Sequence, residues 1–205
     1  MAPSIAVIDF GGGNLGSLVS ALGRRGADFV VTDDPARVAR ASAAILPGDG
    51  AFGATMAALR ARGLDAAIGS AIAAGKPFLG ICVGMQVLYE AGDEHGEQAG
   101  LGYFPGRVTR FDRAPRVPHM GWNELDVLSD HPFVRGLGVA PYAYFLHSYR
   151  AGVDAYTQAA ATHGERFSAI CARDNVMATQ FHPEKSQATG AILLDNFISL
   201  ATVPA

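Results

Sequence analysis

Short apolar runs alternate with longer stretches of helical apolar spacing through the first half of the chain. The apolar runs predict strands over residues 4–10, 28–32, 43–46 and 77–81. The helical spacing predicts helices over residues 15–25, 54–74 (broken near residue 63) and 83–91. Strands that are apolar throughout and separated by helices are typical of a parallel sheet covered on both faces.

After residue 100 the pattern changes to short strands joined by turns, followed by one closing helix. We predict strands over residues 107–111, 122–128, 142–149, 158–162, 168–173 and 176–181, and a helix over 188–200. The predicted fold class is therefore α/β, with a mostly parallel sheet and a strand-rich second half. Neither repeats nor linkers interrupt the chain, so we expect residues 1–205 to form a single domain.

The composition and the net charge argue against several classes of function. Hydrophobic residues make up 49% of the chain and the net charge is −3, which gives no electrostatic reason to expect binding to nucleic acid or a membrane surface. The N-terminal apolar run lacks preceding basic residues and is predicted to be a strand, not a signal peptide. Two cysteines are too few for a disulfide framework, so we expect a cytoplasmic protein.

A glycine-rich loop offers one functional hypothesis. Residues 11–16 fit the G-x-G-x-x-G pattern between a predicted strand and a predicted helix, and Asp33 and Asp34 follow the next strand. That arrangement is typical of dinucleotide binding. The alternative is that the glycines permit only a tight turn and close packing, because three in a row satisfy the pattern easily.

A second hypothesis centres on Cys82. Gly80-Ile81-Cys82-Val83-Gly84 is the cysteine form of the nucleophile elbow, in which a sharp strand-to-helix turn exposes the nucleophile between glycines. A thiol at a helix N-terminus is also favoured as the reactive thiolate. The alternative, a small buried thiol at a turn, describes most cysteines, including Cys171.

A nucleophile needs a general base, and His182 is the best candidate. We expect His95, His131 and His163 to be solvated, whereas His182 ends a predicted strand. In an extended segment residues two apart face the same way, so Glu184 can orient the imidazole ring of His182. The carboxyl ends of parallel strands share one sheet edge, which would bring Cys82 and His182 together. This pairing favours a Cys-His-Glu triad over a structural cysteine.

Together these motifs resemble the class I glutamine amidotransferases over essentially the whole chain. The resemblance lies in the elbow Gly-Ile-Cys-Val-Gly-Met-Gln (80–86) and in Phe-His-Pro-Glu-Lys-Ser (181–186). Pro-His-Met-Gly-Trp-Asn (118–123) and Tyr-Phe-Leu-His-Ser-Tyr (144–149) are more selective. They are similar to the glutaminase subunits that serve imidazole glycerol phosphate synthase in histidine biosynthesis. The resemblance implies a flavodoxin-like three-layer sandwich.

The resemblance also implies roles for individual residues. Cys82 would attack the side-chain amide of glutamine, with His182 as acid and base and Glu184 as its orienting partner. Two sets of supporting groups are implied: an oxyanion hole from the backbone of Gly48, Asp49, Gly50 and Val83, and substrate contacts from Gln86, His147, Ser148 and Tyr149. Asp49 departs from the uncharged residue common in the family, so only its backbone is expected to take part.

Ammonia would then pass to a separate (β/α)₈-barrel cyclase subunit, with no cofactor or metal required. By resemblance, the interface would include Asn14, His119, Trp122, Tyr144 and Lys185. Three other readings stay open at this point: a free-standing cysteine hydrolase or deglycase, an amidotransferase serving another synthase, and a dinucleotide-binding module with a structural Cys82.

Overall fold

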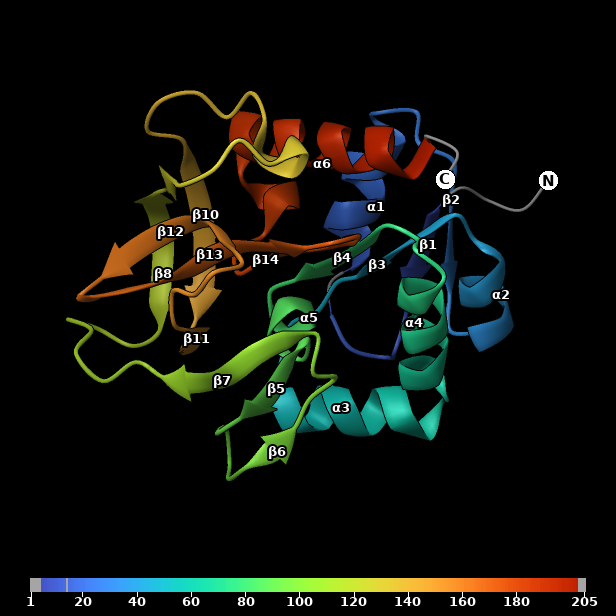
Figure 1. Ribbon diagram of the computed structural model, residues 1–205, viewed down its shortest axis with the longest axis horizontal. Coiled ribbons are helices and arrows are strands. Elements are labelled where there is room, and N and C mark those ends of the chain that lie inside the picture. The colour runs from blue at the N-terminus through green and yellow to red at the C-terminus, as the bar shows by residue number, and fades with distance from the viewer. Residues whose placement is uncertain (1–4, 14, 203–205) are drawn as a thin grey trace.

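The computed structural model describes residues 5–13 and 15–202, and its centre is a large mixed sheet (Figure 1). Eight strands follow the order β2-β1-β3-β4-β14-β13-β12-β9. The five from β2 to β14 pair in parallel, and the rest are antiparallel. Their bounds are β1 Ile5–Ile8, β2 Phe29–Thr32, β3 Ala43–Leu46, β4 Phe78–Ile81, β9 Asp126–Val127, β12 Thr157–His163, β13 Glu165–Arg173 and β14 Val176–Thr179.

Helices cover both faces of this sheet, because its central strands are apolar on both sides. Along β1, Ile5 and Val7 join a core cluster with α1 and α6, whereas Ala6 and Ile8 join a second cluster with α2, α3 and α4. Successive strand residues point to opposite faces, so each face has its own core. The helices are α1 Leu15–Gly23, α2 Pro35–Arg40, α3 Phe52–Ala61, α4 Leu64–Ala73 and α6 Gln187–Thr202.

Two smaller sheets occupy the side of the molecule away from α2 (Figure 1). Strands β8 (His119–Glu124) and β10 (Tyr142–His147) form an antiparallel two-stranded ribbon, here called the β8–β10 ribbon. The other sheet has the order β11-β7-β5-β6, with bounds β5 Tyr89–Gly92, β6 Gln98–Ala99, β7 Phe104–Arg110 and β11 Tyr149–Ala151. Three short helical turns complete the chain: α5 Val83–Gln86, η1 Pro132–Val134 and η2 Pro183–Lys185.

These layers confirm the predicted α/β class, the mostly parallel central sheet and the antiparallel second half. The helix predicted over 83–91 is wrong beyond its first turn: α5 ends at Gln86, and Tyr89 already pairs with Phe104 of β7. A short apolar run fits a buried strand as well as a helix, and here pairing with β7 decided between them. In the described ranges, no helix combines the length and apolarity needed to cross a bilayer.

Candidate active site

Cys82 occupies a strained turn between β4 and α5. Its φ is 56°, a left-handed value that residues with a side chain rarely adopt, and such strain clusters at functional sites. The flanking glycines are sterically required, because a Cβ on Gly80 would lie 2.5 Å from the Gly84 carbonyl oxygen. A Cβ on Gly84 would lie 2.0 Å from the carbonyl oxygen of Leu46. The predicted elbow is therefore formed.

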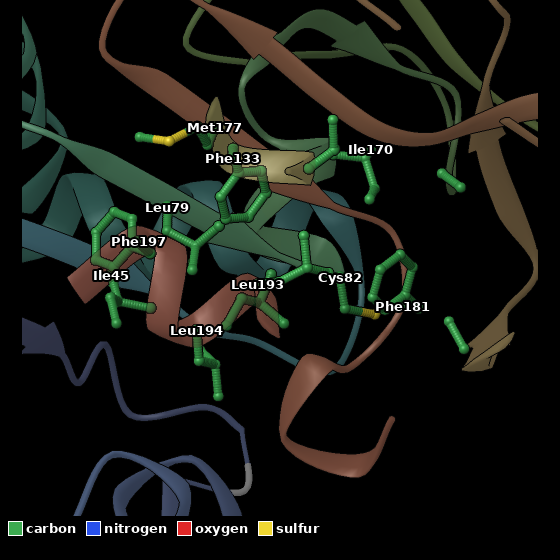
Figure 2. Packing of buried hydrophobic residues seen from close by; sticks show 14 of the residues in the cluster. Ile45, Leu79, Cys82, Phe133, Ile170, Met177, Phe181, Leu193, Leu194 and Phe197 are labelled. Carbon is green, nitrogen blue, oxygen red and sulfur yellow. The ribbon is translucent and has the colours of Figure 1, made fainter. Parts of the chain in front are cut away.

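The thiol of Cys82 lies within a core cluster, near Phe181 (Figure 2). Its backbone N–H donates to the carbonyl of Thr179, which ties the elbow to the end of β14. Cys171 differs: it is fully buried, contacts the Tyr89 hydroxyl at 3.0 Å, and has its pKa raised to about 12 by burial. Cys82 lines a cavity together with His182.

His182 and Glu184 follow β14 and lie against the elbow. The Nδ1–Oε1 distance between them is 2.8 Å, so the predicted contact is present. The backbone differs from the extended segment predicted, because Pro183 begins the 3₁₀ turn η2 directly after His182. The turn brings Glu184 back toward the ring, and the carboxylate fixes its orientation.

The charge state of His182 follows from its neighbours. Burial alone would lower the pKa of its imidazole, but hydrogen bonds with Cys82 and Glu184 outweigh burial and raise the pKa to about 10. The ring is therefore an imidazolium at neutral pH. A neighbouring positive charge favours the thiolate form of cysteine, which is the nucleophile.

A cavity of about 290 Å³ opens above this pair and joins most of the predicted site residues. This volume is at the small end for ligand pockets and suits a molecule of amino-acid size. Predicted residues that line it are Asp49, Gly50, Cys82, Gln86, His147, Ser148, Tyr149 and His182. Gly48, Val83 and Glu184 lie outside the lining.

The segment from Pro47 to Gly50 packs directly on the elbow. A Cβ on Gly48 would lie 2.4 Å from Cγ1 of Val83, so only glycine permits this approach. Val83 is the first residue of α5, and the N–H groups of a first helical turn have no partner in the helix. The Asp49 side chain is exposed at the cavity rim.

The orientation of the Gln86 amide is determined by its partners. Its Nε2 donates to the backbone carbonyl of Tyr149 at 3.0 Å and to Oε1 of Gln180 at 3.1 Å. Both amide protons are thus engaged inside the protein. The Oε1 atom of Gln86 is left as the acceptor available to a ligand in the cavity.

Three residues without a predicted site role also line the cavity: Glu94, Pro118 and Leu146. The half-buried Glu94 accepts a hydrogen bond from the backbone N–H of Phe52 at 2.8 Å, so its carboxylate is held at the rim. Glu94 follows a strand in a polar turn and no local signal distinguishes it. Leu146 contributes its carbonyl oxygen, 4.0 Å from the Cys82 sulfur.

The residues expected at a partner interface divide into three groups. Trp122 and Lys185 are exposed and Tyr144 is half-buried, with the rings of Trp122 and Tyr144 in edge contact at 6.1 Å. The interface role predicted for His119 does not fit the structure. His119 is only 4% exposed and packs among aromatic rings, so its side chain offers no surface to a partner. Asn14 lies outside the described residues.

The glycine loop and Asp34, one of the two acids that follow the next strand, have structural explanations. A Cβ on Gly13 would lie 3.4 Å from the Cα of Gly48, so this loop packs against the Pro47–Gly50 segment. The Asp34 side chain accepts from the backbone N–H of Ala36 and caps α2. Asp34 is therefore occupied as a helix cap, which weakens the dinucleotide hypothesis. Within residues 5–13 and 15–202, no group of three or more His, Cys, Asp or Glu side chains could hold a metal ion.

Comparison with known sequences points to one family. The pattern of the family described as Glutamine amidotransferase class-I matches residues 6–200. The chain is 47% identical over 205 residues to the Imidazole glycerol phosphate synthase subunit HisH of Salinibacter ruber, covering 96% of this chain and 94% of that protein. It is 45% identical over 207 residues to the protein of the same name from Gloeothece citriformis, covering 98% of each.

Solved structures of other proteins share the fold of this chain. A crystal structure of a glutamine amidotransferase has a TM-score of 0.77 and 22% identity, covering 98% of this chain and 100% of that one. The structure of PurLQS from Thermotoga maritima has a TM-score of 0.74 and 21% identity, covering 97% and 99%. With the sequence match over nearly its full length, the chain belongs to the class I glutamine amidotransferase family.

Proposed function

We propose that this chain, as one amidotransferase domain over residues 1–205, is the glutaminase subunit of an imidazole glycerol phosphate synthase. It hydrolyses glutamine to glutamate and ammonia, and the ammonia serves the formation of imidazole glycerol phosphate and AICAR in histidine biosynthesis. The observation that carries the proposal is the strained Cys82 beside the His182–Glu184 pair at a small cavity. The full-length similarity to HisH proteins selects the synthase.

The first half of the reaction forms a thioester. The Cys82 thiolate attacks the side-chain amide carbon of glutamine, and the oxyanion is stabilised by backbone N–H groups of Val83 and the Pro47–Gly50 segment. The carbon–nitrogen bond then breaks, and the His182 imidazolium gives its proton to the leaving ammonia. His182 is left neutral, with Glu184 still holding its Nδ1.

The second half releases glutamate. Neutral His182 takes a proton from a water molecule, whose oxygen attacks the thioester carbon. The carbon–sulfur bond breaks, which regenerates the Cys82 thiolate and the imidazolium. The strained turn supports both halves because it keeps the sulfur at the cavity surface, although the residue is only 7% exposed.

The amino-acid end of glutamine is recognised by the opposite part of the cavity. Oε1 of Gln86 and the Glu94 carboxylate are acceptors, and they suit the positively charged α-ammonium group. Ser148 and the backbone of Tyr149 complete this side of the lining. A substrate held there places its side-chain amide toward Cys82.

The partner surface is the outer face of the β8–β10 ribbon. Met120 and Trp122 on β8 face outward beside Tyr144 and Leu146 on β10, in direct cross-strand pairs. Met120 is 67% exposed and Trp122 48%, which makes an apolar patch of the kind used in protein interfaces. Because Leu146 also lines the cavity, a (β/α)₈-barrel cyclase seated on this patch would receive ammonia close to its source.

The direct test is Cys82→Ala. The variant should lose glutamine hydrolysis while keeping the thermal unfolding profile and the cyclase affinity of the parent chain. Substantial glutaminase activity in the variant, assayed with its cyclase subunit, would refute the proposed nucleophile. Cys171→Ala is the matched control and should keep the activity.

A second test concerns dependence on the partner. We expect the isolated chain to hydrolyse glutamine poorly, because the Pro47–Gly50 segment is completed by the cyclase and its ligand. Equal turnover with and without the cyclase and its ribulosyl nucleotide substrate would contradict this. We also propose a cytoplasmic location, which suits two cysteines that are both unpaired.

A further inference from the structure

A series of hydrogen bonds, buried at His119 and His147, runs from Asn123 of the β8–β10 ribbon to the expected substrate contacts. Asn123 Nδ2 lies 3.2 Å from Nε2 of His119, and Nδ1 of His119 lies 2.9 Å from Nε2 of His147. Nδ1 of His147 lies 2.8 Å from the carbonyl oxygen of Tyr149. That carbonyl is the same acceptor that holds Gln86.

The position of each proton in this series of hydrogen bonds can be assigned by starting from the Tyr149 carbonyl. The Tyr149 carbonyl can only accept, so Nδ1 of His147 carries the proton. Burial lowers the pKa of His147 to about 3 and that of His119 to about 4, so both rings are neutral. Nε2 of His147 must then accept, which places the proton of His119 on Nδ1.

The hydrogen bond between Asn123 and His119 fits the same proton positions. Nε2 of His119 is an acceptor, and the Asn123 amide donates to it while also donating to the carbonyl of Thr162. The direction of every bond is therefore set, from Asn123 through two imidazoles to Tyr149. His163, expected to be solvated, is half-buried: its ring stacks on His119 at 4.2 Å, while its Nε2 bonds to the Arg116 carbonyl and lies outside this series of hydrogen bonds.

We propose that His119 is a positioning residue for glutamine binding, acting through His147 and the Tyr149 carbonyl to hold the Gln86 amide with Oε1 toward the substrate. Resting on the proposed function, this inference assigns His119 to the substrate side of the site, where a partner contact was predicted. Without the donor at Nδ1 of His119, the His147 ring can turn or change tautomer. The Tyr149 carbonyl then loses one of its two donors.

The test uses the full chain with its cyclase subunit and measures glutaminase kinetics. His119→Phe keeps an aromatic ring but removes both nitrogens, whereas His119→Asn keeps one donor and one acceptor. We expect His119→Phe to raise KM for glutamine roughly tenfold with kcat nearly unchanged, the scale of one lost hydrogen bond. His119→Asn should restore KM toward the wild-type value. His163→Phe, in the same aromatic cluster, is the control and should leave KM unchanged.

A second measurement does not depend on activity. Nitrogen-15 NMR of the wild-type chain should show both His119 and His147 protonated at Nδ1 and unprotonated at Nε2. An Nε2–H form of either ring, or an unchanged KM in His119→Phe, would overturn the inference while leaving the glutaminase proposal intact. A wild-type complex that does not hydrolyse glutamine would overturn both.

Discussion

The contact between α6 and η2, the turn that carries Glu184, makes Gly190→Ala a sharp test of how the proposed triad is positioned. Gly190 lies in the first turns of α6, and a Cβ there would be 1.7 Å from the carbonyl oxygen of Pro183. Ordinary van der Waals contact begins near 3.4 Å. The helix and η2 would therefore have to separate by roughly 1.7 Å at this point.

Such a separation would displace His182, the proposed general base, because it directly precedes Pro183. Pro183 stands between His182 and Glu184, whose 2.8 Å contact orients the ring. A displacement of about 1 Å in a catalytic group can cost on the order of 100-fold in rate. Overpacking costs about 1–3 kcal/mol, partly offset by the roughly 1 kcal/mol that alanine gains over glycine in a helix.

We therefore expect Gly190→Ala to lower kcat/KM by about 100-fold, with a loss of stability of no more than about 2 kcal/mol. Glutaminase assays with the cyclase and thermal unfolding of the chain measure the two effects. Gly69→Ala is the matched control: it lies inside α4, and its Cβ would meet only the Tyr103 hydroxyl at 3.4 Å. Wild-type activity in Gly190→Ala would show that the packing of α6 against η2 does not position His182 and Glu184.

Two further predictions concern the partner surface and acid stability. Trp122→Ala should weaken cyclase binding roughly thirtyfold, the scale of an interface hot spot, without changing the unfolding temperature of the isolated chain. Calorimetric titration measures this, and an unchanged affinity would remove the β8–β10 ribbon from the interface. Glu165→Gln should destabilise the chain by roughly 3 kcal/mol at pH 7, since it leaves the charge of the Arg150 guanidinium without the negative charge of its buried partner. Burial raises the pKa of Glu165, but hydrogen bonds from Asp112 N–H and Arg150 outweigh it and hold the pKa below its usual value. The carboxylate therefore stabilises the fold above pH 4.5 and loses this effect as the pH falls further. The gap between wild type and variant in urea unfolding should shrink on acidification, and a gap that is constant with pH would contradict the ion pair.

The sequence predicted the fold well where one local pattern decided the structure. The strand over 43–46 and the break near Gly63 match β3 and the junction of α3 and α4. The elbow was also predictable, because two glycines beside a cysteine have a specific steric meaning. The helix over 83–91 failed since its second half is apolar enough for either structure, and only pairing with β7 selects the strand.

The rest of the site depends on contacts between distant parts of the chain. His119 and His147 meet because β8 and β10 pair in a register that places them opposite each other. Glu94 reaches the cavity through a bond to Phe52, which is 42 residues away in sequence. Neither contact leaves a trace in the local pattern, so the family resemblance suggested a surface role for His119 and the residue types suggested no role for Glu94.

We propose a separate role for each face of the β8–β10 ribbon, partner contact outside and support of the substrate contacts inside, and together these roles limit the changes in strand length that the ribbon can accept. Trp122 and Leu146 face outward, while His119 and Phe145 face the interior. A shift of one residue in either strand exchanges the faces, because strand side chains alternate with a period of two. A single-residue insertion or deletion in β8 or β10 would thus turn that strand's half of the apolar patch inward and expose its one histidine of the pair. Substitutions can change one face at a time, whereas length changes can preserve both only in steps of two residues.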